Sequence, residues 1–398
     1  MHIAWLGKKS PFCGNVTYSR EVTNALLDRG HRVSFLHFAQ EAPNPESKPE
    51  WSLNNGKWGS GTGESSMKEV SLPCLYKSQI YTIPTFKSSK VLEKALRRLK
   101  PDLVHASLTL SPLDFLHLPE ICEELNLPLI ATFHPPFDRK VRNLTSGTQQ
   151  LMYQLYAPFL ANYTSVIVFS NIQRDILVKL GVPEERVAII PNGVDTLKYS
   201  PGGSELKAKL GCDRVFVYQG RIAPEKNVES LLKAWKKADM GRKSRLLIVG
   251  DGPLTSSLQM FYGPDDGILW LGFIGDEERR IEILRGADVF ILPSFVEGLS
   301  LSLLEAMSCG LACIATDAGA DGEVLEDGAG IVLDPQRVTS QLQTLLPVLQ
   351  EQPEFTTILG QKARQRVLDR YTLSNNITQV EQLYVELKRE AIKQKEYA

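Results

Sequence analysis

The chain has 398 residues, of which 43% are hydrophobic and 23% charged, and its formal net charge at neutral pH is −1. This length predicts about two domains, and the near-zero net charge gives no support for a nucleic-acid partner. The longest apolar runs are strand-like and fall short of the roughly 18–20 residues that cross a bilayer. Lys8-Lys9 interrupt the first apolar run too early for a secretory signal. We therefore expect a cytoplasmic protein without a transmembrane segment.

Short β-branched runs alternate with segments of helical period through the front half of the chain, which is typical of a parallel sheet covered by helices. The predicted strands are 2–6, 32–38, 102–106, 129–133, 165–169 and 187–190. Residues 39–63 are rich in Pro, Asn, Gly and Ser and predict a long loop, either functional or a tolerated surface insertion.

Turn residues cluster at 191–203 and predict a linker near 195–210, after which a second alternation begins. Its predicted strands are 215–219, 245–249, 268–271, 288–292 and 312–316. The segment from Pro353 to Ala398 has a strongly helical pattern and is long enough to cross back over the front domain. The prediction is therefore an α/β protein with domains at 1–200 and 201–375 and a returning helix at 376–398.

Six cysteines occur without a C-x-x-C pair, which predicts reduced thiols rather than a disulfide framework. Cys309 and Cys313 could form half of a metal site. Because their surroundings are apolar and contain no nearby histidine, small core residues are the better interpretation.

The segment 295–307 follows a buried strand and is expected to open a helix, whose first amides favour an oxygen-rich or anionic ligand. We expect the turn at Glu297, Gly298, Leu299 and Ser300 to aim these amides at the ligand. Glu305 is eight residues beyond Glu297, about two helical turns, so both carboxylates could face one ligand and hold sugar and ribose hydroxyls. Chance spacing is the alternative, but a carboxylate among Leu303, Leu304, Ala306 and Met307 is costly without a partner.

Arg221 and Lys226 also follow a predicted strand and precede a helix. They could converge on a diphosphate, as a guanidinium fork and a point charge, although an ordinary surface pair is the alternative. The chain contains no D-x-D sequence, so we expect no metal and no other cofactor, with the two cations neutralising a leaving nucleoside diphosphate.

Three further positions lie at predicted strand ends. Gly250, in the Gly-Asp-Gly turn, is either a packing glycine or a ligand contact. Gly14 and Asn15 occupy the place where nucleotide-binding folds approach their ligand, yet the sequence departs from G-x-G-x-x-G, which counts against NAD or FAD. His134 projects at a sheet edge and could meet a sugar, whereas His105 lies inside a strand and is interpreted as a core residue.

These motifs together resemble family 4 of the retaining glycosyltransferases, which have the GT-B fold. The resemblance is carried by Gly14, FHPP at 133–136, PNGVD at 191–195, GRIAPEKN at 220–227, VGDGP at 249–253, the Glu297/Glu305 pair and TDAGADGEVLEDG at 316–328. It implies two Rossmann-like domains facing a cleft and front-face transfer of a hexose from a UDP-sugar with retention. In this resemblance Arg221 and Lys226 bind the diphosphate, Glu305 the ribose, and Glu297 and His134 the sugar.

Two positions depart from the family pattern. Asn15 follows Gly14 where many relatives have consecutive glycines, and Ala320-Asp321-Gly322 stretches the usual double-glycine turn. These departures bear on the fit of acceptor or sugar rather than on the class of reaction.

The N-terminal stretch 3–38 more narrowly resembles the cyanobacterial type of digalactosyldiacylglycerol synthases, which implies galactose transfer from UDP-galactose to monogalactosyldiacylglycerol. Residues 74–100 carry seven cations and one acid, and Val91, Leu92, Ala95, Leu96 and Leu99 form one apolar helix face that could rest on anionic lipid. The alternative is a helix that covers the sheet. A sugar-nucleotide epimerase, a glycosyl phosphorylase and a non-catalytic sugar-nucleotide sensor are rival functions on a similar scaffold.

Overall fold

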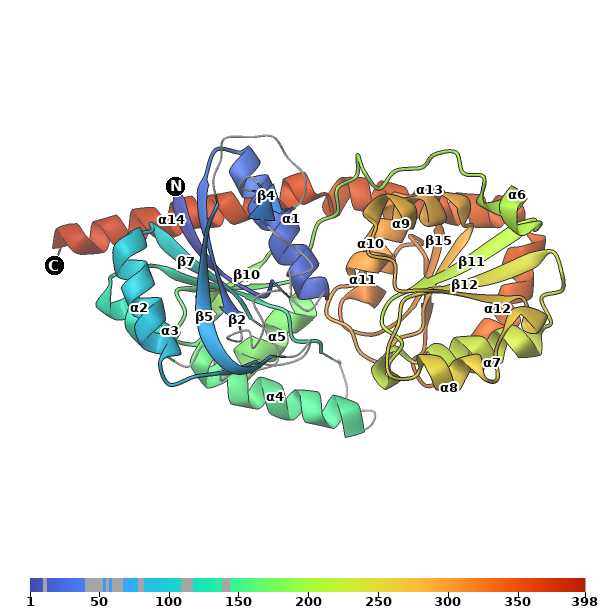
Figure 1. Ribbon diagram of the computed structural model, residues 1–398, viewed down its shortest axis with the longest axis horizontal. Coiled ribbons are helices and arrows are strands. Elements are labelled where there is room, and N and C mark those ends of the chain that lie inside the picture. Colours follow the sequence, from blue (N-terminus) through green and yellow to red (C-terminus); the bar gives the residue numbers. More distant parts are fainter. Residues whose placement is uncertain are drawn as a thin grey trace. The chain divides into compact units, whose positions relative to one another are not determined.

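A computed structural model describes residues 1–9, 13–39, 53–54, 57–58, 67–77, 82–108, 117–137 and 144–397 (Figure 1). The chain forms two compact units. The first comprises Met1–Pro135, Thr148–Pro191 and Ser374–Ala398, and the second Pro136–Gly147 and Asn192–Leu373. The sequence predicted domain boundaries after residues 200 and 375. The structure divides the chain after Pro191 and after Leu373.

The division after Pro191 has a physical cause in the turn that follows it. The amide of Val194 donates to the Tyr371 carbonyl, and the amide of Leu373 donates back to Val194. A Cβ on Gly193 would lie 2.6 Å from the Cα of Leu373, so only glycine allows this close approach. The turn is therefore fastened to the end of the second unit rather than being a free linker.

The first unit is built on a sheet whose described strands are arranged in the order β10-β9-β8-β7-β1-β2-β5-β6. All neighbours pair in parallel except β5 and β6, which are antiparallel. The strands are β1 (His2–Leu6), β2 (Arg32–Ala39), β5 (Lys68–Lys77), β6 (Thr82–Pro84), β7 (Leu103–Leu108), β8 (Leu129–Phe133), β9 (Ser165–Val168) and β10 (Val187–Ile189). Every residue of β1, β7, β8 and β9 is buried, as expected for strands covered on both faces.

Helices connect these strands and cover the sheet. They are α1 (Gly14–Asp28), α2 (Ser88–Leu99), α3 (Leu118–Glu124), α4 (Leu144–Leu160) and α5 (Asn171–Lys179). The C-terminal helix α14 (Leu373–Tyr397) also packs on this unit from Ser374 onward. Its Tyr384 hydroxyl hydrogen-bonds to the Nδ1 atom of the fully buried His105, which confirms His105 as a core residue.

The second unit has a parallel sheet with described strands in the order β13-β12-β11-β14-β15-β16. The strands are β11 (Arg214–Gln219), β12 (Ser244–Val249), β13 (Ile268–Gly272), β14 (Val289–Leu292), β15 (Ala312–Thr316) and β16 (Ile331–Leu333). In chain order this is 3-2-1-4-5-6, the doubly wound order of dinucleotide-binding folds, and it confirms the predicted fold class of two parallel-sheet α/β domains.

The helices of the second unit alternate with its strands, as Figure 1 shows for α7, α10 and α12. They are α6 (Leu206–Leu210), α7 (Val228–Ala238), α8 (Thr255–Gln259), α9 (Glu277–Gly286), α10 (Leu301–Ser308), α11 (Asp321–Leu325), α12 (Val338–Glu351) and α13 (Pro353–Arg370). Cys309 and Cys313 are buried free cysteines of this core, as predicted.

The sequence did not indicate five of the described strands, β3 (Leu53–Asn54), β4 (Lys57–Trp58), β5, β6 and β16. β5 lacks the alternation of a half-buried strand, since only Leu72 and Cys74 are buried among its ten residues, whereas β6 and β16 have three residues each. The predicted loop at 39–63 lies mostly outside the described residues, apart from Ala39 and the short strands β3 and β4. No helix of the described chain is long and apolar enough to cross a membrane.

The predicted apolar face of residues 91–99 is directed inward. Leu92, Ala95 and Leu96 of α2 are buried, and the helix packs against β5. The interpretation that this face rests on lipid is therefore wrong, because the sheet already covers it.

Gly250 joins the loops at the carboxyl ends of β11 and β12. Its φ is +137°, and a Cβ there would lie 1.8 Å from the carbonyl oxygen of Gly220. Gly241 also has a positive φ, +66°, but a Cβ there would meet no atom within 4 Å. We expect Gly241→Ala to cost about 1 kcal/mol of stability and Gly250→Ala clearly more, because only the second also displaces backbone. Denaturant titration of both variants measures this, and equal midpoints would contradict the packing role of Gly250.

Candidate functional site

Two loops meet where the strand order of the second unit reverses. β11 and β14 are neighbours in the sheet, paired at Phe216 with Val289 and at Val217 with Phe290, and their helices leave the carboxyl edge in opposite directions along the sheet. The loop after β11 contains residues 220–227, and the loop after β14 contains residues 293–300. Ligands of open parallel sheets bind outside the carboxyl ends of the strands at such a reversal point.

The two loops are joined by backbone and side-chain contacts. The amide of Phe295 donates to the Glu225 carbonyl at 2.9 Å, and Asn227 Nδ2 donates to the Pro293 carbonyl at 3.1 Å. Asn227 has a φ of 50°, a left-handed conformation that asparagine tolerates, and this turn starts α7. The loops therefore form one assembly rather than two independent segments.

An ion pair forms the centre of this assembly. Lys226 Nζ lies 2.6 Å from Glu297 Oε1, and the side chains of Lys226 and Glu297 are 22% and 10% exposed. The structure thus brings together two of the predicted site residues. Arg221 forms an ion pair with Glu225 in the same loop. Both cations therefore have a carboxylate partner, and both remain partly open to solvent.

Glu297 does not share a helix with Glu305, and the prediction that both acids lie on one helix is wrong. α10 begins at Leu301, and Ser300 caps it with extended backbone and a hydroxyl that accepts from the Leu303 amide at 3.3 Å. Serine at this position satisfies an unpaired amide of the first turn, so the helix begins four residues after Glu297 and does not include it. Only Glu305 is helical.

Glu305 lies beneath the loops as a buried carboxyl group. Gln219 Nε2 donates to its Oε2 atom at 2.8 Å, and the Tyr199 hydroxyl also hydrogen-bonds to it. Burial raises the pKa of Glu305 to about 7, and the opposing influences of Arg280, Tyr199 and Gln219 do not cancel this effect. The carboxyl group is therefore poised to take up or lose a proton near neutral pH.

Asp321 is a site residue whose role the sequence did not indicate. It is 1% exposed, its Oδ1 atom accepts from the Ser300 amide at 2.9 Å, and its Oδ2 atom has no hydrogen-bond partner among the described residues. Burial and the neighbouring charge of Glu297 raise its pKa well above the usual range. Its position in the stretched turn of the 316–328 motif was the available signal.

The same turn supports the loop after β14. The amide of Ala320 donates to the Gly298 carbonyl at 2.7 Å, and a Cβ on Gly319 would lie 2.3 Å from the Glu297 carbonyl oxygen. Among the amides predicted to face a ligand, that of Ser300 already donates to Asp321. Those of Gly298 and Leu299 have no acceptor within the described part of the chain, so they are available to an oxygen-rich group.

Two other residues hold this region and were not among the predicted site residues. Gln219 ends β11 and bonds Glu305, and Asn192 Nδ2 donates to the Leu299 carbonyl at 3.0 Å. Both side-chain oxygens, Gln219 Oε1 and Asn192 Oδ1, are buried without a partner in the described structure. A polar residue directly after the buried run VFVY of β11 was a signal for Gln219.

The front-half residues belong to the first unit and lie at the carboxyl edge of its sheet. Gly14 is the first residue of α1, and Asn15 follows it with both side-chain amide atoms buried and unpartnered among the described residues. His134 follows β8, where its Nε2 atom hydrogen-bonds to Ser107 Oγ at 3.0 Å and its ring meets Tyr18 edge-on. Burial lowers the pKa of His134 to about 3, so its imidazole is neutral at ordinary pH.

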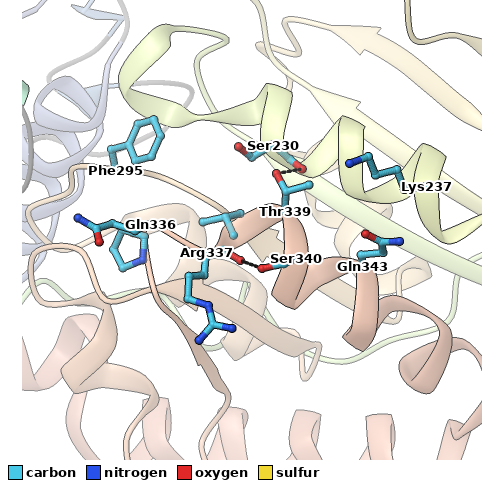
Figure 2. Close-up of a pocket in the computed structure, with 10 residues that line it drawn as sticks. Ser230, Lys237, Phe295, Gln336, Arg337, Thr339, Ser340 and Gln343 are labelled. Atoms are coloured by element: carbon cyan, nitrogen blue, oxygen red, sulfur yellow. Dashed lines mark hydrogen bonds between the residues drawn. The ribbon is translucent and has the colours of Figure 1, made fainter.

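A polar cavity of about 500 Å³ lies elsewhere in the second unit, beside α7 and the start of α12 (Figure 2). Its lining residues include Ser230, Lys237, Phe295, Arg337 and Gln343. Thr339 Oγ1 donates across it to the Ser230 carbonyl at 3.4 Å. None of the predicted site residues lines this cavity.

The arrangement at the carboxyl edge suits an anionic ligand that also carries hydroxyl groups. Lys226 and Arg221 offer positive charge, two loop amides offer hydrogen bonds, and Glu297 and Glu305 can accept from hydroxyls. The described residues hold no group of three or more His, Cys, Asp or Glu side chains that could bind a metal ion.

Comparisons with known proteins agree with this arrangement. A family model described as "Glycosyl transferases group 1" matches residues 205–366, and one described as "Glycosyltransferase Family 4" matches residues 13–198. The chain is 28% identical over 341 residues to the UDP-Gal:alpha-D-GlcNAc-diphosphoundecaprenol alpha-1,3-galactosyltransferase of Escherichia coli, covering 81% of this chain and 85% of that relative.

Solved structures share the fold over nearly the whole length. The sucrose-phosphate synthase of Thermosynechococcus elongatus superposes with a TM-score of 0.75 at 21% identity, covering 97% of this chain and 98% of that one. The Anabaena protein HepE, solved in complex with UDP-glucose, superposes with a TM-score of 0.73 at 18% identity, covering 96% of this chain and 99% of that one.

The raised pKa of Glu305 predicts a pH-dependent stability. A carboxyl group with a pKa of about 7 in the folded state and 4.5 as its ordinary value stabilises the fold below pH 4.5, and this contribution is lost as the pH rises to 7. We expect Glu305→Gln to remove this dependence, gaining up to about 3 kcal/mol relative to the native chain between pH 5 and 8. Thermal unfolding across this range measures the effect, with the exposed Glu229→Gln as control; parallel curves for native chain and Glu305→Gln would contradict it.

Proposed function

We propose that this chain, a group 1 glycosyltransferase, transfers a hexose from a UDP-sugar to a hydroxyl of a lipid-borne sugar. Nucleotide sugars are the donors of this family. The observation that carries the proposal is the Lys226–Glu297 pair at the strand-order reversal, with Arg221 in the same loop and Glu305 below it. Such a grouping matches the parts of a nucleotide sugar: a diphosphate, a ribose diol and a hexose.

In this proposal the donor's diphosphate lies against Lys226 and Arg221 and accepts from the amides of Gly298 and Leu299. Ammonium and guanidinium groups bind phosphate oxygens strongly in a partly buried site, where water screens them less. Glu305 accepts from the ribose hydroxyls, most strongly in its ionised form, and Glu297 accepts from a hexose hydroxyl. Gly250 supports the donor site indirectly, because its lack of a side chain lets the loop after β12 pack against the backbone of Gly220.

We propose UDP-galactose as the donor. The E. coli relative is named for transfer from UDP-Gal, and the resemblance of residues 3–38 to digalactosyldiacylglycerol synthases implies the same sugar. HepE, which shares the fold, binds UDP-glucose in its solved complex, so UDP-glucose is the donor to compare.

The proposed reaction retains the anomeric configuration and uses no metal ion or other cofactor. The acceptor oxygen bonds to the anomeric carbon on the face from which the diphosphate leaves, and the acceptor proton passes to the departing phosphate oxygen. Lys226 and Arg221 stabilise the charge that develops on the diphosphate, as a divalent cation would. His134 is proposed as a sugar contact through its neutral ring or its backbone, since a pKa of about 3 makes it a poor general base.

For the acceptor we propose monogalactosyldiacylglycerol, with digalactosyldiacylglycerol as product, made by a cytoplasmic protein that associates peripherally with the membrane. A second candidate is a lipid-linked sugar diphosphate, as in the name of the E. coli relative. Lys8 and Lys9 follow β1 and Lys77 ends β5, at the same edge of the first unit's sheet. Burial, and after it the charges of Lys8 and Lys9, lower the pKa of Lys77 to about 8. A sheet edge that carries these three lysines suits the second candidate, whose diphosphate is anionic.

The diphosphate assignment predicts a large effect of Lys226→Ala. We expect UDP to bind about 10- to 100-fold more weakly, because a charge-assisted hydrogen bond is lost, and transfer to fall by about 100-fold or more. Calorimetry with UDP and initial rates of UDP release measure the two effects. Lys233→Ala, at an exposed lysine of α7 paired with Glu229, is the matched control and should change neither. Native UDP affinity in Lys226→Ala would refute the assignment.

Product analysis tests donor, acceptor and stereochemistry together. The pure protein is mixed with labelled UDP-galactose or UDP-glucose and with monogalactosyldiacylglycerol or a sugar diphosphate lipid. We expect UDP to appear only with both substrates and the new linkage to be α, as in the donor. Isomerised donor without acceptor would indicate an epimerase, sugar 1-phosphate formed with inorganic phosphate a phosphorylase, and donor binding without turnover a sensor.

A further inference from the structure

His134, the proposed sugar contact of the first unit, has two ring nitrogens in different surroundings. Its Nε2 atom lies 3.0 Å from Ser107 Oγ, so this nitrogen already has a hydrogen-bond partner. Its Nδ1 atom has no partner among the described residues, and the residue as a whole is partly exposed. Nδ1 is therefore the ring nitrogen that remains for a ligand.

The surroundings of Ser107 decide which member of this hydrogen bond is the donor. Ser107 lies inside β7 and is fully buried, and within the described part of the chain its hydroxyl has His134 Nε2 as its one partner. If Nε2 carried a proton and donated it to Ser107 Oγ, the serine hydrogen would remain in the core without an acceptor. Because an unpaired buried donor is costly, the serine hydroxyl donates to Nε2.

This direction of the hydrogen bond fixes the tautomer of His134. Burial lowers the pKa of His134 to about 3, so the ring is neutral at ordinary pH and carries a single proton. Since Nε2 accepts from Ser107, that proton lies on Nδ1. The nitrogen that a ligand meets is then an N–H donor, whereas the basic lone pair of the ring is occupied by the serine hydroxyl.

Buried neighbours hold the His134 ring in one orientation. The ring meets Tyr18 edge-on with centroids 4.6 Å apart, and the Phe169 ring lies 5.2 Å away. The Tyr18 hydroxyl hydrogen-bonds to Thr132 Oγ1 at 3.1 Å, and the same Thr132 atom hydrogen-bonds to His105 Nε2 at 2.7 Å. All four neighbours are buried, so turning the ring to exchange its nitrogens would displace core side chains.

We propose that Ser107 is a positioning residue for sugar transfer: by donating to His134 Nε2, it sets the tautomer in which Nδ1–H donates a hydrogen bond to an oxygen of the hexose. This inference rests on the proposed function only in assigning that oxygen to the hexose. A protonated Nδ1 has no lone pair, so this nitrogen does not take the proton of the acceptor hydroxyl. The acceptor proton is then left to the departing phosphate oxygen.

Nitrogen NMR of the full chain with isotopically labelled histidines tests the tautomer without any substrate. The spectrum distinguishes a protonated from an unprotonated ring nitrogen, and the signals lost in His134→Gln identify those of His134. We expect a protonated Nδ1 and an unprotonated Nε2 in the native chain. Ser107→Ala should lower the population with the proton on Nδ1, whereas Ser107→Thr, which keeps the hydroxyl, should preserve it. A protonated Nε2 in the native chain, or an unchanged tautomer in Ser107→Ala, would overturn the proposal.

Initial rates and UDP affinity measure the consequence for transfer. Ser107→Ala should lower kcat/KM for the UDP-sugar about tenfold, the value of one hydrogen bond, yet leave the affinity for UDP native, because UDP lacks the hexose. Ser34→Ala is the matched control, since the buried Ser34 hydroxyl hydrogen-bonds to His2 Nε2 at 2.9 Å where β1 begins. Equal kinetics of the two variants would refute the positioning role. If the native chain transfers no sugar, the proposed function fails, and the NMR spectrum still decides the tautomer.

Discussion

The ion pair between Lys226 and Glu297 connects the two loops on which the candidate site depends. Each residue follows a different strand, and the strands are neighbours only because the chain winds the sheet in the order 3-2-1-4-5-6. A lysine and a glutamate so little exposed are costly to desolvate unless they face each other or a charged ligand. The pair therefore holds the two loops together, and its charged groups are suited to bind a diphosphate sugar.

The three acidic residues of the candidate site, Glu297, Glu305 and Asp321, each have a different set of partners. Glu297 is paired, Glu305 is held by Gln219 and Tyr199, and Asp321 is buried against the Ser300 amide. Burial and the charge of Glu297 raise the pKa of Asp321 well above its ordinary range, so a second negative charge beside Glu297 is disfavoured. Lys226 therefore faces the charge of Glu297, while burial also raises the pKa of Glu305, which Gln219 holds.

Local patterns in the sequence determined the fold class and all but the shortest or most exposed strands. They also identified Lys226, Arg221 and Glu297 as residues that follow strand ends and Glu305 as a residue of the next helix. These features are readable because burial imposes a period on each element and strand ends in parallel sheets share one edge. Only the tertiary structure decided that Glu297 precedes α10, that Asp321 and Gln219 join the site, and that the apolar side of α2 faces the sheet. Such outcomes depend on partners distant in sequence, as Asp321 is from Ser300, and no local period records them.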